Sequence, residues 1–172
     1  MRSLVVYESS FGNTQRIAEQ IAAALAQEGD VELVSVDEPL PQLDEVDLLV
    51  VGAPTHVHGL SGRRSRQSAL DQGADGELGI GVRGWIDALP NGGRGPRIAA
   101  FDTRAHKPVL LVGSAARGIV RRLRQRGYTL AAEPESFFVE GTQGPLEEGE
   151  LDRAREWGRT IGNEVSRAAV MI

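Results

Sequence analysis

The sequence predicts an α/β fold, a doubly wound five-stranded parallel sheet in a three-layer α/β/α arrangement. Short apolar runs alternate along the chain with longer amphipathic runs, the order that builds a parallel sheet covered on both faces. Segments 9–14, 53–62 and 102–113 are rich in small or polar residues and each follows an apolar run. They would therefore meet at the carboxyl ends of the strands, where such sheets bind ligands. With 172 residues, the chain is expected to form a single domain, 1–172.

The first β–α unit has the clearest pattern. Ser3–Glu8 is a short apolar run of the kind buried in parallel sheets. Residues 14–27 place Ile17, Ile21 and Leu25 at helical spacing among good helix formers. Val31–Val36 alternates apolar and polar residues, which is typical of a half-buried edge strand. Leu48–Val51 is continuously apolar and stops at Gly52-Ala53-Pro54, so it is expected to be a central strand.

The middle of the chain is glycine-rich, from residue 59 to 82, and shows no firm periodicity. So long a segment without a pattern predicts a functional or mobile loop. Arg66–Gln72 could add a helical turn within it. Val82–Leu89 is expected to be a helix with Trp85 in the core, followed by a turn at Asn91–Pro96.

The second half continues the alternation of strands and helices. A helix at Ser114–Arg126 ends at Gly127, the residue type that favours the left-handed conformation after a last turn. Two strand-like pieces could form one interrupted fifth strand, with Tyr128 and Phe137-Phe138 expected in the core. The other expected elements, in chain order, are the fourth strand at Arg97–Phe101, the strand-like pieces Tyr128–Ala132 and Ser136–Glu140, and a last helix at Glu148–Arg167.

The composition excludes several classes of function. There is no cysteine, which excludes disulfides, thiolate catalysis and iron–sulfur clusters. No apolar run is long enough to span a membrane, and the first residues lack the features of a signal peptide, so a cytoplasmic protein is expected. The net charge of −5 argues against a nucleic-acid partner. No Ser-His-Asp arrangement, Walker lysine or Gly-x-Gly-x-x-Gly motif supports a hydrolase or a nucleoside triphosphatase.

The loop Ser9-Ser10-Phe11-Gly12-Asn13-Thr14 lies between the first strand and the first helix. The first N–H groups of a helix lack partners within the helix and carry a partial positive charge, so they favour an anion. Hydroxyl and amide side chains add donors without bulk. The loop therefore predicts a phosphate-binding site.

These segments resemble the flavodoxin-like family. Ser9–Thr14 is similar to its Ser/Thr-x-Thr-Gly-x-Thr phosphate loop, and Gly52-Ala53-Pro54-Thr55 to the Gly-x-Pro-Thr segment that begins its second flavin loop. The region from Asp102 lies where the third flavin loop should be. The resemblance implies a flavodoxin-like fold with strand order 2-1-3-4-5 and FMN as cofactor.

The resemblance also implies which residues contact the flavin. The first loop would hold the phosphate, and the other two would bracket the isoalloxazine. In full, the implied contacts are Ser9, Ser10, Phe11, Gly12, Asn13, Thr14, Pro54, Thr55, His56, Val57, His58, Gly59, Asp102, Thr103 and Arg104. Phe11 replaces a hydroxyl of the flavodoxin pattern and is more typical of the related quinone reductases, and neither ring-contacting segment carries a Trp or Tyr to stack on the flavin.

Three functions remain open at this point. The first is an FMN-binding redox protein acting in electron transfer or flavin-dependent reduction, with a redox protein, a small quinone or NAD(P)H as partner. The second is an NAD(P)H-dependent quinone reductase, a dimer in which Arg63, Arg64 or Arg104 would meet a nucleotide phosphate. The third is a flavodoxin-fold binding module without flavin. The chain could thus be a monomer or a homodimer, and Asp102 could equally cap the next helical turn.

The pair His56-x-His58 could in principle serve metal binding or acid–base chemistry. Alternate residues of an extended segment share a face, but zinc needs further ligands and only His106 and scattered carboxylates remain. No metal site is predicted. Either histidine could protonate a quinone oxygen.

Overall fold

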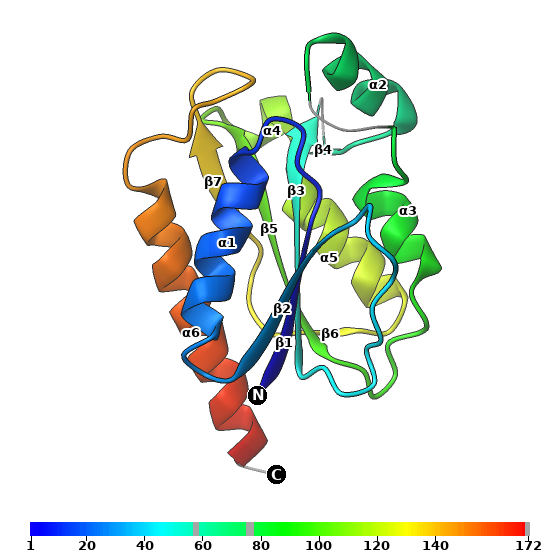
Figure 1. The fold of residues 1–172 in the computed structure, drawn as a ribbon, viewed down its shortest axis with the longest axis vertical. Coiled ribbons are helices and arrows are strands. Elements are labelled where there is room, and N and C mark those ends of the chain that lie inside the picture. The colour runs from blue at the N-terminus through cyan, green and yellow to red at the C-terminus, as the bar shows by residue number, and fades with distance from the viewer. Residues whose placement is uncertain (57–58, 75–77, 171–172) are drawn as a thin grey trace.

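A parallel sheet forms the centre of the molecule in the computed structural model, which describes residues 1–56, 59–74 and 78–170 (Figure 1). The strands run in the order β2-β1-β3-β5-β6, and β7 is also paired with β5. All of these pairings are parallel. The strand bounds are β1 (Arg2–Tyr7), β2 (Asp30–Ser35), β3 (Leu48–His56), β5 (Arg97–Ala105), β6 (Thr129–Leu130) and β7 (Glu135–Val139).

The strands β6 and β7 share the fifth position of the sheet. β6 pairs with Arg97–Ile98 at the start of β5, and β7 pairs with Phe101–Ala105 at its end. The two pieces are thus one edge strand interrupted around Pro134, as the sequence suggested. The predicted order 2-1-3-4-5 is confirmed.

Helices cover both faces of the sheet, which confirms the three-layer arrangement (Figure 1). The helices α1 (Asn13–Leu25) and α6 (Glu150–Val170) pack against each other on one face, whereas α3 (Gly81–Ala88) and α5 (Ala115–Gln125) cover the other. An apolar core lies between the sheet and each helical layer. Trp85 is buried in the core under α3 and α5, as predicted. Within the described residues, none of the helices is both long and apolar enough to cross a membrane.

Two central strands extend further than the sequence indicated. β3 continues through Gly52-Ala53-Pro54-Thr55 to His56, and β5 continues from Phe101 to Ala105, so these residues are not loops. Gly52 allows this because a Cβ there would overlap the buried Phe101 ring on the neighbouring strand. Pro54 has no N–H to donate to a neighbouring strand. It is tolerated because the pairing of β1 with β3 ends at Gly52, so β3 has no parallel partner on that side at Pro54.

The segment 59–82, which has no firm periodicity in the sequence, is not one long loop, and the helical turn expected at Arg66–Gln72 is confirmed as part of a helix. The segment contains β4 (Gly59–Leu60), which pairs antiparallel with the end of β3, then α2 (Arg63–Asp71) and the start of α3. Polar contacts with the buried side chain of Glu8, which periodicity does not reveal, hold this segment in place. A further single turn, α4 (Val109–Val112), lies after β5. The other helix ends lie within a few residues of the predicted ones, and Gly127 follows α5 with a φ of 88° as expected.

Candidate functional site at the carboxyl ends of the strands

The loop between β1 and α1 turns sharply at Gly12. This residue is the N-cap of α1 and has a φ of 80°, the left-handed region that favours glycine. No atom lies within 4 Å of the position that a Cβ would take there. Ser9, Ser10 and Phe11, which precede it, are all partly exposed. The backbone at Gly12 is therefore open to close approach by a ligand.

The N-terminus of α1 retains free hydrogen-bond donors. The N–H of Gln15 donates to Ser9 Oγ over 3.3 Å, and that of Arg16 donates to the Gly12 carbonyl over 3.1 Å. The N–H groups of Asn13 and Thr14 have no acceptor among the described residues. Because the Ser9 hydroxyl accepts from Gln15, its own proton remains available to donate. These donors point to a bound anion.

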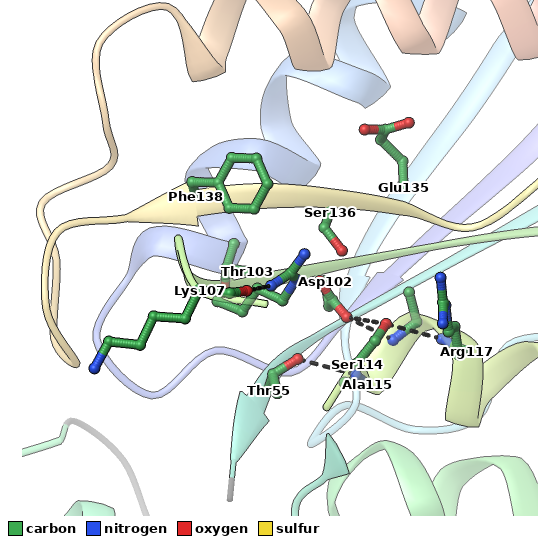
Figure 2. Close-up of polar contacts among 12 residues, drawn as sticks. Thr55, Asp102, Thr103, Lys107, Ser114, Ala115, Arg117, Glu135, Ser136 and Phe138 are labelled. Atoms are coloured by element: carbon green, nitrogen blue, oxygen red, sulfur yellow. Dashed lines mark hydrogen bonds and ion pairs between the residues drawn. The ribbon is translucent and has the colours of Figure 1, made fainter. Parts of the chain in front are cut away.

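The N-terminus of α5 is satisfied by the protein itself (Figure 2). Ala115 N–H donates to Thr55 Oγ1 at 2.9 Å, and Ala116 N–H to Asp102 Oδ2 at 3.0 Å. The N-cap Ser114 accepts from Arg117 N–H at 3.2 Å and donates its own proton to Asp102 Oδ2 at 2.6 Å. The first three N–H groups of α5 thus have side-chain acceptors, so this helix start has no need of an anion.

The start of α3 has one side-chain acceptor, Glu8, which follows β1. Glu8 is buried, and its Oε2 accepts from Val82 N–H at 2.8 Å while its Oε1 accepts from Ser61 Oγ at 2.6 Å. Arg66 of α2 donates to Ser61 Oγ at 3.3 Å and to the Gly79 carbonyl at 3.2 Å. Of these three helices, only α5 has side-chain acceptors for all of its first three N–H groups.

The phosphate loop is tied to two other segments. Thr14 is buried, and its hydroxyl lies 2.8 Å from the hydroxyl of Thr103 on β5. Asn13 Nδ2 donates to the Gln143 carbonyl at 2.7 Å. The Thr14 hydroxyl is therefore engaged within the protein, and only the backbone N–H of Thr14 remains free to bind a ligand. These two links hold the loop in place before any ligand binds, which lowers the entropic cost of binding.

The residues predicted to bracket a flavin ring lie mostly within strands. Pro54, Thr55 and His56 are partly exposed at the end of β3, but the Thr55 hydroxyl is engaged by α5. Asp102 is completely buried and holds α5, so the helix-capping alternative for its carboxylate is confirmed. Gly59 is partly exposed in β4, whereas Val57 and His58 lie outside the described residues.

Burial also governs the protonation of His56. Desolvation lowers the pKa of His56 below its ordinary value of 6.5; the nearby Glu8 carboxylate opposes this effect and Arg66 adds to it. Its Nε2 atom is buried and has no hydrogen-bond partner among the described residues. At neutral pH the imidazole is therefore uncharged.

An aromatic side chain that the sequence analysis assigned to the core lies beside this site. Phe138 of β7 is only partly buried, and the His106 ring stacks on it with centroids 4.0 Å apart. The guanidinium of Arg104 lies 5.0 Å from the same ring centroid and donates to the Lys107 carbonyl at 2.6 Å (Figure 2). His106 Nδ1 is 3.1 Å from a Glu147 carboxylate oxygen. Phe138 thus braces the segment after β5.

Three residues with clear structural roles were not identified from the sequence: Glu8, Arg66 and Phe138. Glu8 carried a detectable signal, because it is a carboxylate directly after an apolar strand, at the edge where polar residues serve a site. Arg66 stood in an arginine cluster without a distinguishing pattern, and Phe138 differs from its buried neighbour Phe137 only by the alternation of a strand.

The loop chemistry fits a phosphate group. It offers a glycine with open space above it, two hydroxyls and two unpaired N–H groups, and no carboxylate is part of it. Beside the loop, Ser9 and Ser10 line a small hollow that also contains the guanidinium of Arg66 and the carboxylates of Glu8 and Asp37, so the loop gains no net positive charge from it.

Comparison with known proteins bears on the family and the fold of the chain. Residues 4–66 match the model of a family described as a flavodoxin domain. Among curated proteins, none matches the sequence.

Solved flavodoxin structures share the fold along nearly the whole chain. A flavodoxin from the domain Archaea is 22% identical, with a TM-score of 0.66 over 96% of this chain and 99% of that one. Flavodoxin 2 from Bacillus cereus, in its oxidised form, is 21% identical, with a TM-score of 0.67 over 95% and 99% of the two chains. A WrbA-like flavodoxin from Agrobacterium tumefaciens is 19% identical, with a TM-score of 0.59 over 96% and 98%. The family match in the N-terminal part and the shared fold support the resemblance noted in the sequence: this chain has a flavodoxin-like fold.

Proposed function

We propose that this protein binds FMN and acts as a redox protein. The observation that carries the proposal is the open start of α1. The N–H groups of Asn13 and Thr14 have no acceptor among the described residues, and they lie beside an open Gly12. At the start of α5, by contrast, side chains accept from the first three N–H groups. The loop that resembles a flavin phosphate loop thus leaves donors free for a ligand.

The phosphate would be held by neutral donors. Ser9 and Ser10 would donate from their hydroxyls, and Asn13 and Thr14 from their backbone N–H groups. Each hydrogen bond to a charged group contributes about 1.5–3 kcal/mol. Four of them, less the cost of association, are sufficient for affinity in the micromolar range or better, by order of magnitude.

The ring would lie against the partly exposed end of β3. Pro54 and His56 offer surface there, and the uncharged His56 imidazole places no cation beside the ring. Bound FMN would supply one- or two-electron transfer, and the chain would supply binding, orientation and exclusion of water.

A flavin titration tests the proposal. We expect saturable quenching of FMN fluorescence by the purified protein and a yellow complex that survives gel filtration. Ser10→Ala removes one donor to the phosphate and is expected to weaken FMN binding by about 1–2 kcal/mol, or roughly five- to thirtyfold.

Ser68→Ala is the matched control, because Ser68 is exposed on α2 and its hydroxyl accepts only from Gln72 within the same helix. Its FMN affinity is expected to equal that of the wild type. A protein that stays colourless and leaves FMN fluorescence unchanged would overturn the proposal in favour of a binding module without flavin.

A further inference from the structure

A second pocket lies on the opposite side of the β3 end from the phosphate loop, between α3 and α5. Its volume is about 440 Å³, within the usual range of small-molecule sites. Its floor is made by β4 and by Gly118 of α5, where a Cβ would come within 3.2 Å of the Leu60 side chain. The absence of a side chain at Gly118 thus lets β4 lie against α5 and leaves the pocket open.

Four arginines line this pocket. Arg83 comes from α3, and Arg117, Arg121 and Arg122 come from α5. Arg117 and Arg121 are four residues apart and therefore lie on one side of the helix. Arg83 faces them from α3 and is steadied by a 3.3 Å hydrogen bond to the Leu60 carbonyl. The pocket is thus lined by arginines from two elements.

The charges of these arginines are largely unmatched. Arg122 has an ion pair with Asp87, at 3.7 Å, and Asp87 is mostly exposed. Among residues 1–56, 59–74 and 78–170, no carboxylate lies within ion-pair distance of Arg83, Arg117 or Arg121. Like charges held together around one cavity repel each other, so an anion in the pocket would stabilise the folded protein.

We propose that this pocket binds a diphosphate group. The planar fork of a guanidinium matches the oxygens of a phosphate in pairs, and cations on two sides of the cavity suit two adjacent phosphates better than one. The cavity has room for a group larger than a single phosphate. Its concave shape favours a small molecule over the convex surface of an acidic protein. This pocket is separate from the Ser9–Thr14 loop, but Gly59 in its floor is also one of the implied flavin contacts. The proposal does not depend on FMN binding.

Calorimetric titration of the protein without added flavin tests the site. The probes are inorganic pyrophosphate, inorganic phosphate, ADP and NADPH, each at low ionic strength and again at about 0.15 M salt. We expect saturable binding of pyrophosphate, weaker binding of phosphate, and lower affinity at the higher salt. Tighter binding of ADP or NADPH than of pyrophosphate would assign the diphosphate to a nucleotide, and the reverse order would assign it to free pyrophosphate; either supports the site.

Matched charge changes locate the binding. Arg83→Gln and Arg117→Gln each remove a cation from the pocket and are expected to weaken pyrophosphate binding by roughly ten- to hundredfold. Arg124→Gln is the control, because it removes the same charge from the same helix as Arg117. Arg124 does not line this pocket; it lines a neighbouring hollow with Glu133, which Arg117 and Arg121 border as well. Its affinity is expected to stay close to that of the wild type.

Unchanged melting temperatures of the three variants without ligand would show that each is folded, since all three side chains are at the surface. An absence of saturable pyrophosphate binding would overturn the proposal. So would an equal loss in all three variants, because it would show attraction to the general charge of α5 and not to the pocket.

Discussion

Asp102 offers the sharpest quantitative test of how the candidate site is built. Its side chain is completely buried, and a single carboxylate oxygen accepts from Ser114 Oγ at 2.6 Å and from Ala116 N–H at 3.0 Å. Each hydrogen bond to a charged acceptor contributes about 1.5–3 kcal/mol, so Asp102→Ala should lower the free energy of unfolding by roughly 3–6 kcal/mol. Much of this loss comes from leaving the Ala116 N–H buried without an acceptor.

Asp102→Asn separates hydrogen bonding from charge. The amide oxygen can occupy the position of the accepting carboxylate oxygen and keep both hydrogen bonds, now as neutral ones worth about 0.5–1.5 kcal/mol each. The amide nitrogen then takes the place of the other oxygen, which lies 4.0 Å from Arg104 Nε. We expect a loss of roughly 1–3 kcal/mol, clearly smaller than for alanine.

Urea unfolding followed by circular dichroism measures both variants. Since domains of this kind have a total stability of about 5–15 kcal/mol, the asparagine variant stays measurable even where the alanine variant is largely unfolded. A loss below about 1 kcal/mol for Asp102→Ala would refute the conclusion that this carboxylate holds α5, because a single neutral hydrogen bond is worth that much. Equal losses in the two variants would show that charge, and not capping, is the source of the effect.

Two further predictions concern β3. Gly52→Ala places a methyl group against the buried Phe101 ring, which packs against Phe137 and Trp157, and should lower the free energy of unfolding in urea by about 1–3 kcal/mol. Gly62→Ala is the control and should cost less, because a Cβ there meets no atom within 4 Å. The opposite ranking of the two variants would contradict the packing described. Burial lowers the pKa of His56 below 6.5, so near that pH the folded state binds fewer protons at His56 than the unfolded state does. The neutral imidazole therefore contributes to stability fully above about pH 6.5, and this contribution is lost as the pH falls below that value. His56→Gln should therefore flatten the decline of stability between neutral and mildly acidic pH, and identical pH slopes for the variant and the wild type would contradict the assignment.

The fold was largely predictable because its signals are local and repeated. The apolar run of β1, the helical spacing of Ile17 and Ile21, and the alternation along Val31–Val36 each indicate one element, and their order indicates a parallel sheet. Strand ends were less predictable. Gly52 and Pro54 are typical of loops, but here the glycine makes room for Phe101 and the proline has no partner on one side.

The candidate site was predictable in its position and only partly in its contacts. The residue types of Ser9–Thr14 indicated a phosphate site at a helix start, and the structure places open donors there. It could not be foreseen that Thr55 would be used to hold α5 or that Thr14 would pair with Thr103, since both depend on contacts between residues far apart in the sequence. The same holds for Glu8, whose partners come from the glycine-rich segment.

Comparison of FMN with riboflavin tests the central claim most directly, because the two ligands differ only in the phosphate. If the loop at the start of α1 holds that group through several charge-assisted hydrogen bonds, FMN should bind roughly a hundredfold or more tightly than riboflavin. Fluorescence titration of both ligands with the wild-type protein gives the ratio. A ratio near a hundred or above is the predicted result, and equal affinities would contradict the assignment of this loop as a phosphate site.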